Sequence, residues 1–158
     1  MMTFEVKLTG DQLADVSQEI LARAASLRFT ATGSSMSPFI RDGDQVTIER
    51  VKAAELRLGD VALYRSFGGR ALVHRFLWRR KAAGGPVCLI RGDASCGACE
   101  EVPAEQVLGR VVEVSRDGHV FHPGGLGRRI FALTWAYASP FTFRAWRLVR
   151  KVRRLGVR

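Results

Sequence analysis

The stretch DVALYRSFGGRALVHRFLWR, residues 60–79, decides the fold expected for this chain. Mostly apolar runs lie on both sides of Gly68-Gly69, and both contain β-branched or aromatic side chains. Short runs of this kind, separated by a glycine turn, are typical of strands rather than of helices. The stretch therefore predicts two strands, at 60–66 and 70–79, with a turn between them.

The same pattern extends in both directions, from Arg28 to about His122. Short alternating or apolar runs are broken there by glycine and aspartate, as in RDGD at residues 41–44. Regular strands joined by short turns predict a mainly β protein, built as a coiled, mostly antiparallel barrel or pair of sheets. Further strands are expected near 28–32, 44–50, 86–91, 107–115 and 118–122.

The two ends of the chain have a helical pattern instead. Thr9 and Gln12 fit a capping box, and apolar residues at helical spacing follow them, which predicts an amphipathic helix over 10–27. The chain is also expected to be helical after residue 123, with Pro140 dividing two helices. The expected organisation is a helical segment at 1–27, a β domain at 28–122 and a basic, aromatic helical tail at 123–158.

Charge is concentrated at the C-terminal end. Of the 25 Lys and Arg residues, nine lie from Arg128 onward, where there is no acidic residue. Arginines interleaved with aromatic residues are typical of helices that lie on anionic membrane surfaces, so peripheral membrane attachment is expected. A helix packed on the β domain would have the same composition. Nucleic acid is not expected as a partner, because no recognition motif accompanies the basic residues.

Localisation and cofactors follow from what the sequence lacks. No signal peptide and no apolar stretch long enough to span a bilayer is visible, so a cytoplasmic protein without a transmembrane helix is expected. Cys88, Cys96 and Cys99 are too few for a disulfide framework and are expected to be reduced. Cys96 and Cys99 together with His119 and His122 have the chemistry of zinc ligands, but the gap between the histidines is short for such a site. No metal and no cofactor are expected.

The loop GSSMSP, residues 33–38, is the first candidate for chemistry. Its small residues would leave Ser35 exposed, and the proline would hold the loop stiffly, as a nucleophile requires. The backbone N–H of Ser35 would then be available to a developing oxyanion. An ordinary turn that ends a strand has the same composition, so the loop also fits a purely structural role.

A serine nucleophile needs a base, and His74 is the best candidate. It lies in the strand expected at 70–79, on one face with apolar residues, where a core histidine would also fit. Its ordinary pKa near 6.5 suits it to accept a serine proton around neutral pH. Asp93, at the end of the next strand, is placed to orient that histidine, or else to accept backbone hydrogen bonds within a turn.

Six short motifs occur along the chain in this order: GSSMSP (33–38), RDGD (41–44), GDVALY (59–64), VHR (73–75), RGD (91–93) and VLGRVV (107–112). In sequence and order they resemble the successive boxes of type I signal peptidases. The VHR triplet is similar to that of the archaeal and endoplasmic-reticulum branch, whose base is histidine; bacterial housekeeping members use lysine. The resemblance implies a Ser35–His74 dyad on a coiled β fold, with Asp93 as the supporting acid.

The expected function is that of a serine endopeptidase acting on a leader, signal or precursor peptide. Substrate and oxyanion contacts are expected from Ser34, Ser35, Met36 and Pro38. Two alternatives remain at this point. One is a self-cleaving regulator related to the SOS repressors, which share the fold and use a lysine base. The other is a peptide-binding module of the same fold without activity.

Overall fold

One antiparallel sheet organises the part of the chain that the computed structural model describes, which is residues 10–23, 26–95, 99–124 and residue 134. The strands pair in the order β1-β2-β7-β3-β4-β5-β6, and β8 pairs with β7. Only β7 departs from chain order, because it inserts between β2 and β3. In chain order the strands are β1 (Ser26–Thr30), β2 (Gln45–Arg50), β3 (Val61–Arg65), β4 (Ala71–Ala82), β5 (Gly85–Arg91), β6 (Glu100–Pro103), β7 (Val107–Arg116) and β8 (His119–Phe121).

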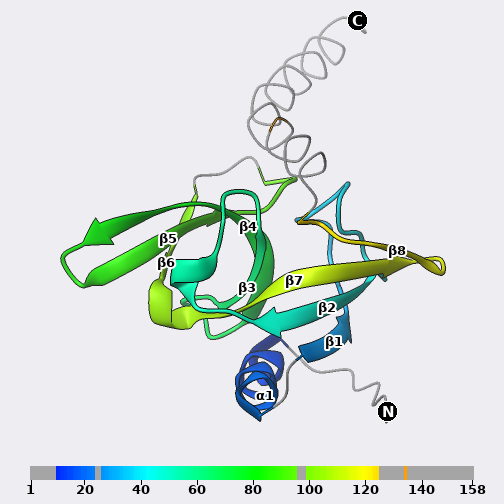
Figure 1. The fold of residues 1–158 in the computed structure, drawn as a ribbon, viewed down its shortest axis with the longest axis horizontal. Coiled ribbons are helices and arrows are strands. Elements are labelled where there is room, and N and C mark those ends of the chain that lie inside the picture. Colours follow the sequence, from blue (N-terminus) through cyan, green and yellow to red (C-terminus); the bar gives the residue numbers. More distant parts are fainter. Residues whose placement is uncertain (1–9, 24–25, 96–98, 125–133, 135–158) are drawn as a thin grey trace, which may run out of the picture.

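The mainly β, antiparallel architecture agrees with the expectation, but a barrel or a pair of sheets was expected and a single sheet is found. Its pairing path ends at β1 on one side and at β6 on the other, so the described residues form an open sheet rather than a closed barrel. Figure 1 shows the β5–β6 end and β8 on opposite sides of the molecule. All seven expected strands occur, with shifted ends. The sequence pattern missed β6 and the two short 3₁₀ turns, η1 (Ala53–Glu55) and η2 (Ala104–Gln106).

The helix α1 (Gly10–Arg23) is shorter than the expected span of 10–27, because β1 already begins at Ser26. It packs against β1, β2, β4 and β7, and it lies at one end of the molecule in Figure 1. Its Leu21 belongs to the main hydrophobic core. No helix of the described residues is long and apolar enough to cross a membrane. The expected C-terminal helices fall on residues 125–133 and 135–158, outside the described residues.

The hydrophobic side chains form two core clusters on opposite faces of β3. Val61 and Leu63 point into the first cluster, and Ala62 and Tyr64 point into the second. Because β3 is buried on both faces, its sequence is a continuous apolar run rather than an alternating one. The first core cluster consists of Leu21, Met36, Ile40, Val46, Ile48, Val61, Leu63, Leu108, Val111 and Val114. The second consists of Ala53, Leu56, Ala62, Tyr64, Phe76, Cys88, Ile90, Val102 and Val107.

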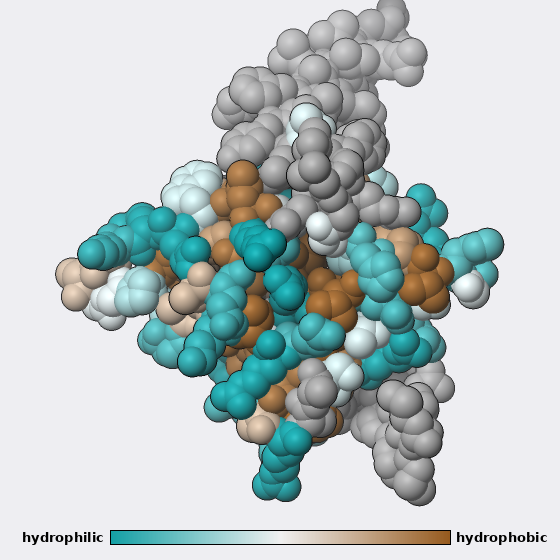
Figure 2. All heavy atoms as spheres, in the orientation of Figure 1, coloured by the Kyte–Doolittle hydropathy of each residue, from teal (hydrophilic) through white to brown (hydrophobic). Residues whose placement is uncertain are grey.

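These clusters lie beneath a polar exterior. On the face drawn in Figure 2, hydrophilic side chains cover most of the described surface, and hydrophobic atoms show between them near the centre.

Glycine is needed where β7 pairs closely with β2. A Cβ at Gly109 would lie 2.6 Å from the carbonyl oxygen of Glu49 and 2.5 Å from the Ile48 side chain. Gly109 therefore allows the close pairing that places β7 in the middle of the sheet.

Candidate active site

Ser35 lies in the loop that joins β1 to β2, and its side chain is exposed. The next residue, Met36, is buried in the first core cluster. The Met36 carbonyl oxygen also accepts hydrogen bonds from the backbone N–H groups of Phe39 and Ile40, each at 3.0 Å. Ser35 is thus an exposed side chain on a backbone that its neighbour anchors in the core.

His74 lies on β4, half-buried, and it faces that loop. Its Nε2 is 3.0 Å from the Oγ of Ser35, which is hydrogen-bonding distance. The two residues expected to form a dyad are therefore in direct contact. This is the nucleophile–base geometry that serine hydrolases use.

The other ring nitrogen of His74 contacts a residue for which no functional role was expected, Tyr64. Nδ1 of His74 lies 2.9 Å from the hydroxyl oxygen of Tyr64, on the adjacent strand β3. The Tyr64 hydroxyl in turn donates to Oε2 of Glu100, on β6, at 2.5 Å. Tyr64 is fully buried in the second core cluster. A chain of contacts thus runs from Ser35 through His74 and Tyr64 to Glu100.

The turn that follows β5 packs directly against this site. The backbone N–H of Ala94 donates to the carbonyl oxygen of Ser35 at 2.8 Å. A Cβ at Gly92 would lie 2.7 Å from that same Ser35 oxygen and 3.2 Å from Nε2 of His74. A Cβ would collide with the Ser35 carbonyl oxygen and crowd the imidazole ring, so glycine at position 92 lets the turn support the Ser35 backbone beside that ring.

The expectation that Asp93 orients His74 is corrected by its contacts. Both carboxylate oxygens of Asp93 accept hydrogen bonds from the guanidinium group of Arg75, at 2.7 and 2.6 Å. Successive side chains of a strand point to opposite faces, so Arg75 and His74 leave β4 in opposite directions. The Arg75 guanidinium also donates to the carbonyl oxygen of Gly59 at 2.7 Å, and both charged side chains are buried. Asp93 therefore joins the turn after β5 to β4, while Tyr64 takes the position at Nδ1.

The environment of each titratable group shifts its pKa. Burial lowers the pKa of His74, and the nearby negative charge of Glu100 partly opposes this shift. Burial and the hydrogen bond to Glu100 raise the pKa of Tyr64 above its ordinary value. Burial raises the pKa of Asp93 as well, against the opposing effect of Arg75. At neutral pH His74 is therefore uncharged and Tyr64 is protonated.

The other residues expected to contact the substrate or the oxyanion are Ser34, Pro38 and Met36, and they differ in exposure. Ser34 is exposed beside Ser35, and its carbonyl oxygen accepts the backbone N–H of Ser37 at 3.0 Å. Pro38 is half-buried and follows a cis peptide bond. The Met36 side chain is buried in the core, so it is not exposed for a direct contact with a substrate.

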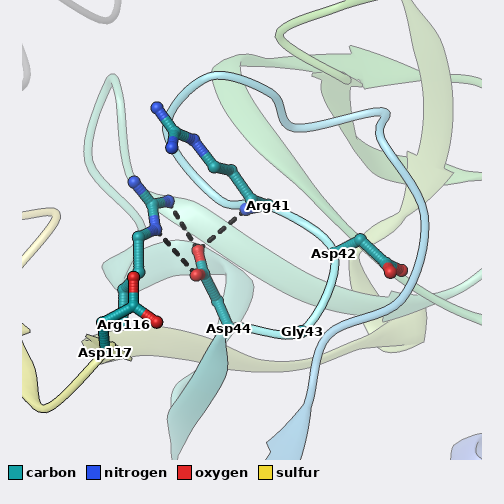
Figure 3. A pocket seen from close by; sticks show the side chains of 6 residues that line it. All are labelled: Arg41, Asp42, Gly43, Asp44, Arg116 and Asp117. Atoms are coloured by element: carbon teal, nitrogen blue, oxygen red, sulfur yellow. Dashed lines mark hydrogen bonds and ion pairs between the residues drawn. The ribbon is translucent and has the colours of Figure 1, made fainter.

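The RDGD motif holds the Ser35 loop in shape. Asp42 accepts the backbone N–H of Gly33 at 2.8 Å. Asp44 accepts two hydrogen bonds from Arg116 of β7, at 2.8 and 2.6 Å, and one from the backbone of Arg41. Figure 3 shows the Asp44 carboxylate between these two arginines, at a polar pocket of about 240 Å³. Although burial acts to raise it, the pKa of Asp44 is lowered by Arg116 and the Arg41 backbone. The motif is therefore structural.

Taken together, the described contacts supply a serine hydroxyl, a neutral imidazole within reach of it, and a tyrosine on the far side of the ring. Such an arrangement can move the serine proton to the imidazole while the serine oxygen attacks an electrophile. Of the four candidate zinc ligands, Cys96 lies outside the described residues, and Nδ1 of His122 lies 2.8 Å from the carbonyl oxygen of Val112.

No protein-family model matches this sequence, and a search of curated proteins finds no match either.

Proposed function

We propose that the chain is a serine endopeptidase of the signal-peptidase type, in which Ser35 is the nucleophile and His74 the general base. The observation that carries this proposal is the 3.0 Å separation between Ser35 Oγ and His74 Nε2. The order of the sequence motifs and the mainly β, antiparallel sheet support it. The exposed Ser35 is accessible to a large substrate, and the half-buried His74 is held beside it.

The proposed reaction has two stages. Ser35 Oγ attacks the carbonyl carbon of the scissile peptide bond while its proton moves to His74 Nε2. The Ser35 backbone N–H stabilises the oxyanion that forms, and His74 then gives its proton to the departing amine, which leaves an acyl group on Ser35. Water, deprotonated by His74, releases the acyl group and restores the serine. No metal or cofactor takes part in these steps.

The proposed substrates are extended peptides within a leader, signal or precursor protein. Family resemblance implies small residues just before the cleaved bond. An extended segment can pair with an exposed strand edge, and the open sheet has such edges at β1 and β6.

The decisive experiment is labelling of the full chain with a serine-reactive acylating probe, followed by mapping of the modified residue. Ser35 is expected to carry the label. Ser35→Ala and His74→Ala should each abolish labelling and peptide cleavage, and the double variant should be no worse than either single one, because the pair acts as a unit.

Thr32→Ala is the matched control, since it removes another exposed hydroxyl from the same loop, at a residue with no expected contact to the substrate. It should label and cleave as the unmodified chain does. Label on Ser34, or cleavage that survives in Ser35→Ala, would contradict the proposal. Shortening of the chain itself at a rate independent of its concentration would favour the self-cleaving alternative.

A further inference from the structure

The hydrogen atoms around His74 can be assigned by counting donors. A tyrosine hydroxyl has one hydrogen. That of Tyr64 is directed at Glu100, and the O···O distance of 2.5 Å is in the range of hydrogen bonds to a charged carboxylate. The Tyr64 oxygen can then only accept from His74, whose Nδ1 lies 2.9 Å away. Nδ1 therefore carries the ring hydrogen, and Nε2 presents a lone pair to Ser35.

We propose that Tyr64 and Glu100 are positioning residues that fix this tautomer of His74 and so keep Nε2 ready to accept the serine proton. The tautomer itself follows from the contacts; its effect on rate rests on the peptidase function proposed above. Neither residue touches Ser35, and both act only through the imidazole. They fill the orienting role that the motif order had suggested for Asp93.

The fold brings these residues together across several strands. Tyr64 is on β3 and Glu100 on β6, three places apart in the sheet. In a flat sheet that separation would be about 14 Å, which is too far for the two side chains to share a 2.5 Å hydrogen bond. The sheet therefore curls around the second core cluster, where Tyr64 packs with Val102 of β6. Glu100 lies two residues before Val102 and hence on the same face.

The pair also has an electrostatic effect in the proposed reaction. When His74 takes the serine proton it becomes a cation, and the negative charge of Glu100 favours that form. Tyr64 keeps its proton throughout, because burial and Glu100 raise its pKa. The only proton that moves in the first step is the one that passes from Ser35 Oγ to His74 Nε2. Among the described residues, the polar side chains that contact the His74 ring are Tyr64 from β3 and Ser35 from the β1–β2 loop, with Glu100 of β6 behind Tyr64.

The first test reads the tautomer directly. Nitrogen NMR of the full chain with ¹⁵N-labelled histidine distinguishes a protonated ring nitrogen from an unprotonated one, and His74→Gln identifies the signals of His74. Hydrogen on Nδ1 is expected in the unmodified chain at neutral pH. Tyr64→Phe keeps the buried ring and removes only the hydroxyl, so His74 should shift toward the Nε2–H form that free imidazole prefers. Retention of the Nδ1–H form in Tyr64→Phe would overturn the proposal.

The second test measures rate and pH dependence. Acylation of Ser35 should slow about 10²-fold in Tyr64→Phe, since a correctly placed base contributes on that scale. In Glu100→Gln the midpoint of the pH profile should move to lower pH, because the carboxylate that raises the pKa of His74 is gone. Glu101→Gln is the matched control: Glu101 is the next residue and pairs with Arg80 at the surface. It should leave both rate and midpoint unchanged.

The two tests separate the two proposals. If the NMR result is as expected but no probe acylates Ser35, the tautomer assignment stands and the peptidase function fails. If Ser35 is acylated but Tyr64→Phe and Glu100→Gln alter neither tautomer nor pH profile, the peptidase function stands and the positioning role of Tyr64 and Glu100 is wrong.

Discussion

Ser35 and His74 are 39 positions apart in the sequence, so their 3.0 Å contact depends on how their neighbours are held. Met36 fixes the loop from the core, and Ala94 binds the Ser35 carbonyl from the turn after β5. Nucleophiles lose efficiency quickly when displaced, and an error of 1 Å can cost about 10²-fold in rate. At the scale of single residues, the site therefore depends as much on backbone support as on the two reacting side chains.

The pH dependence of acylation follows from the environment of His74. Only the neutral ring can accept the serine proton, so activity should rise with pH and then level off. Burial lowers the pKa of His74, which makes the ring neutral at lower pH than free imidazole. The midpoint of the rise is therefore expected below the ordinary value of about 6.5. The measurement is the second-order rate constant for acylation of Ser35 from acidic to alkaline pH; a midpoint well above that of free imidazole would contradict this assignment of the base.

Gly92 offers a test of the backbone support. In Gly92→Ala the new Cβ would lie 2.7 Å from the Ser35 carbonyl oxygen, so either the turn or the Ser35 loop must move. We expect acylation to slow by about 10²-fold. Gly84→Ala is the matched control, because a Cβ at Gly84 meets nothing within 4 Å. Equal rates in the two variants would show that the close approach at Gly92 is not needed for the reaction.

At the scale of elements, sequence patterns predicted every strand of the described residues except β6. The apolar run of β3 and the long strand β4 stand out against glycine turns. By contrast β6, Glu-Glu-Val-Pro, has a single strongly β-forming residue and lies at the edge of the sheet. Its only buried apolar side chain is Val102. Since β6 also carries Glu100, missing the strand meant missing that part of the candidate site.

The error over Asp93 has a related cause. The order of the motifs suggests that Asp93 and His74 lie close together. Whether the Asp93 side chain meets His74 or its neighbour Arg75 depends on how β5 is paired with β4. Here β5 pairs with β4 so that Arg91 is opposite Arg75, and the turn that follows brings Asp93 to Arg75 on the face away from His74. Tyr64 was within a recognised motif, yet only the pairing of β3 with β4 shows that its hydroxyl reaches Nδ1. Contacts between strands are not visible in a single sequence.

The Asp93–Arg75 pair makes a prediction about stability. Asp93→Asn leaves the buried Arg75 charge without its partner, which typically costs about 3–5 kcal/mol in the free energy of unfolding. Urea denaturation of the full chain would measure it. Glu101→Gln is the control, because it breaks a solvent-exposed pair with Arg80 that should contribute little to stability.

Asp93→Asn also separates the two roles considered for this residue. If Asp93 only holds the turn, the folded fraction of the variant should keep the midpoint of the pH profile. A lowered midpoint with unchanged stability would return Asp93 to the role of orienting His74.

At the scale of the whole molecule, the curl of one sheet creates the candidate site. The second core cluster draws side chains from β3, β4, β5, β6 and β7, so these strands must bend around a common centre. Register shifts between Leu63 and Tyr64 and between Phe76 and Trp78 lie within this part of the sheet. Bulges of this kind bend and twist strands, and they are frequent beside active sites. The curl allows a carboxylate on the edge strand to act on a histidine two strands away.

Charge is unevenly distributed along the whole chain, and this leads to the last prediction. Nine of the 25 basic residues follow residue 127, all of them outside the described residues, and no acidic residue accompanies them. We propose that this tail attaches the protein to anionic membrane surfaces. A basic residue near such a surface contributes about 1 kcal/mol, and salt weakens the attraction. Full-length chain should therefore co-sediment with vesicles that contain anionic lipid, and binding should fall as the salt concentration rises.

Two variants of equal charge distinguish the tail from general electrostatic attraction. In the first, Arg144, Arg147, Arg150 and Lys151 are replaced by glutamine; in the second, the exposed Arg50, Arg57, Arg70 and Lys81 of the β domain are replaced. Both lose four positive charges, so attraction by net charge alone would weaken equally in the two. Because the tail combines its charges with tryptophan and phenylalanine, the first variant should lose vesicle binding and the second should keep it. Ser35 should be acylated at the same rate in both, since neither set touches the dyad. Equal weakening of binding in the two variants would mean attraction by net charge alone, and undiminished binding in the first variant would contradict membrane attachment through the tail.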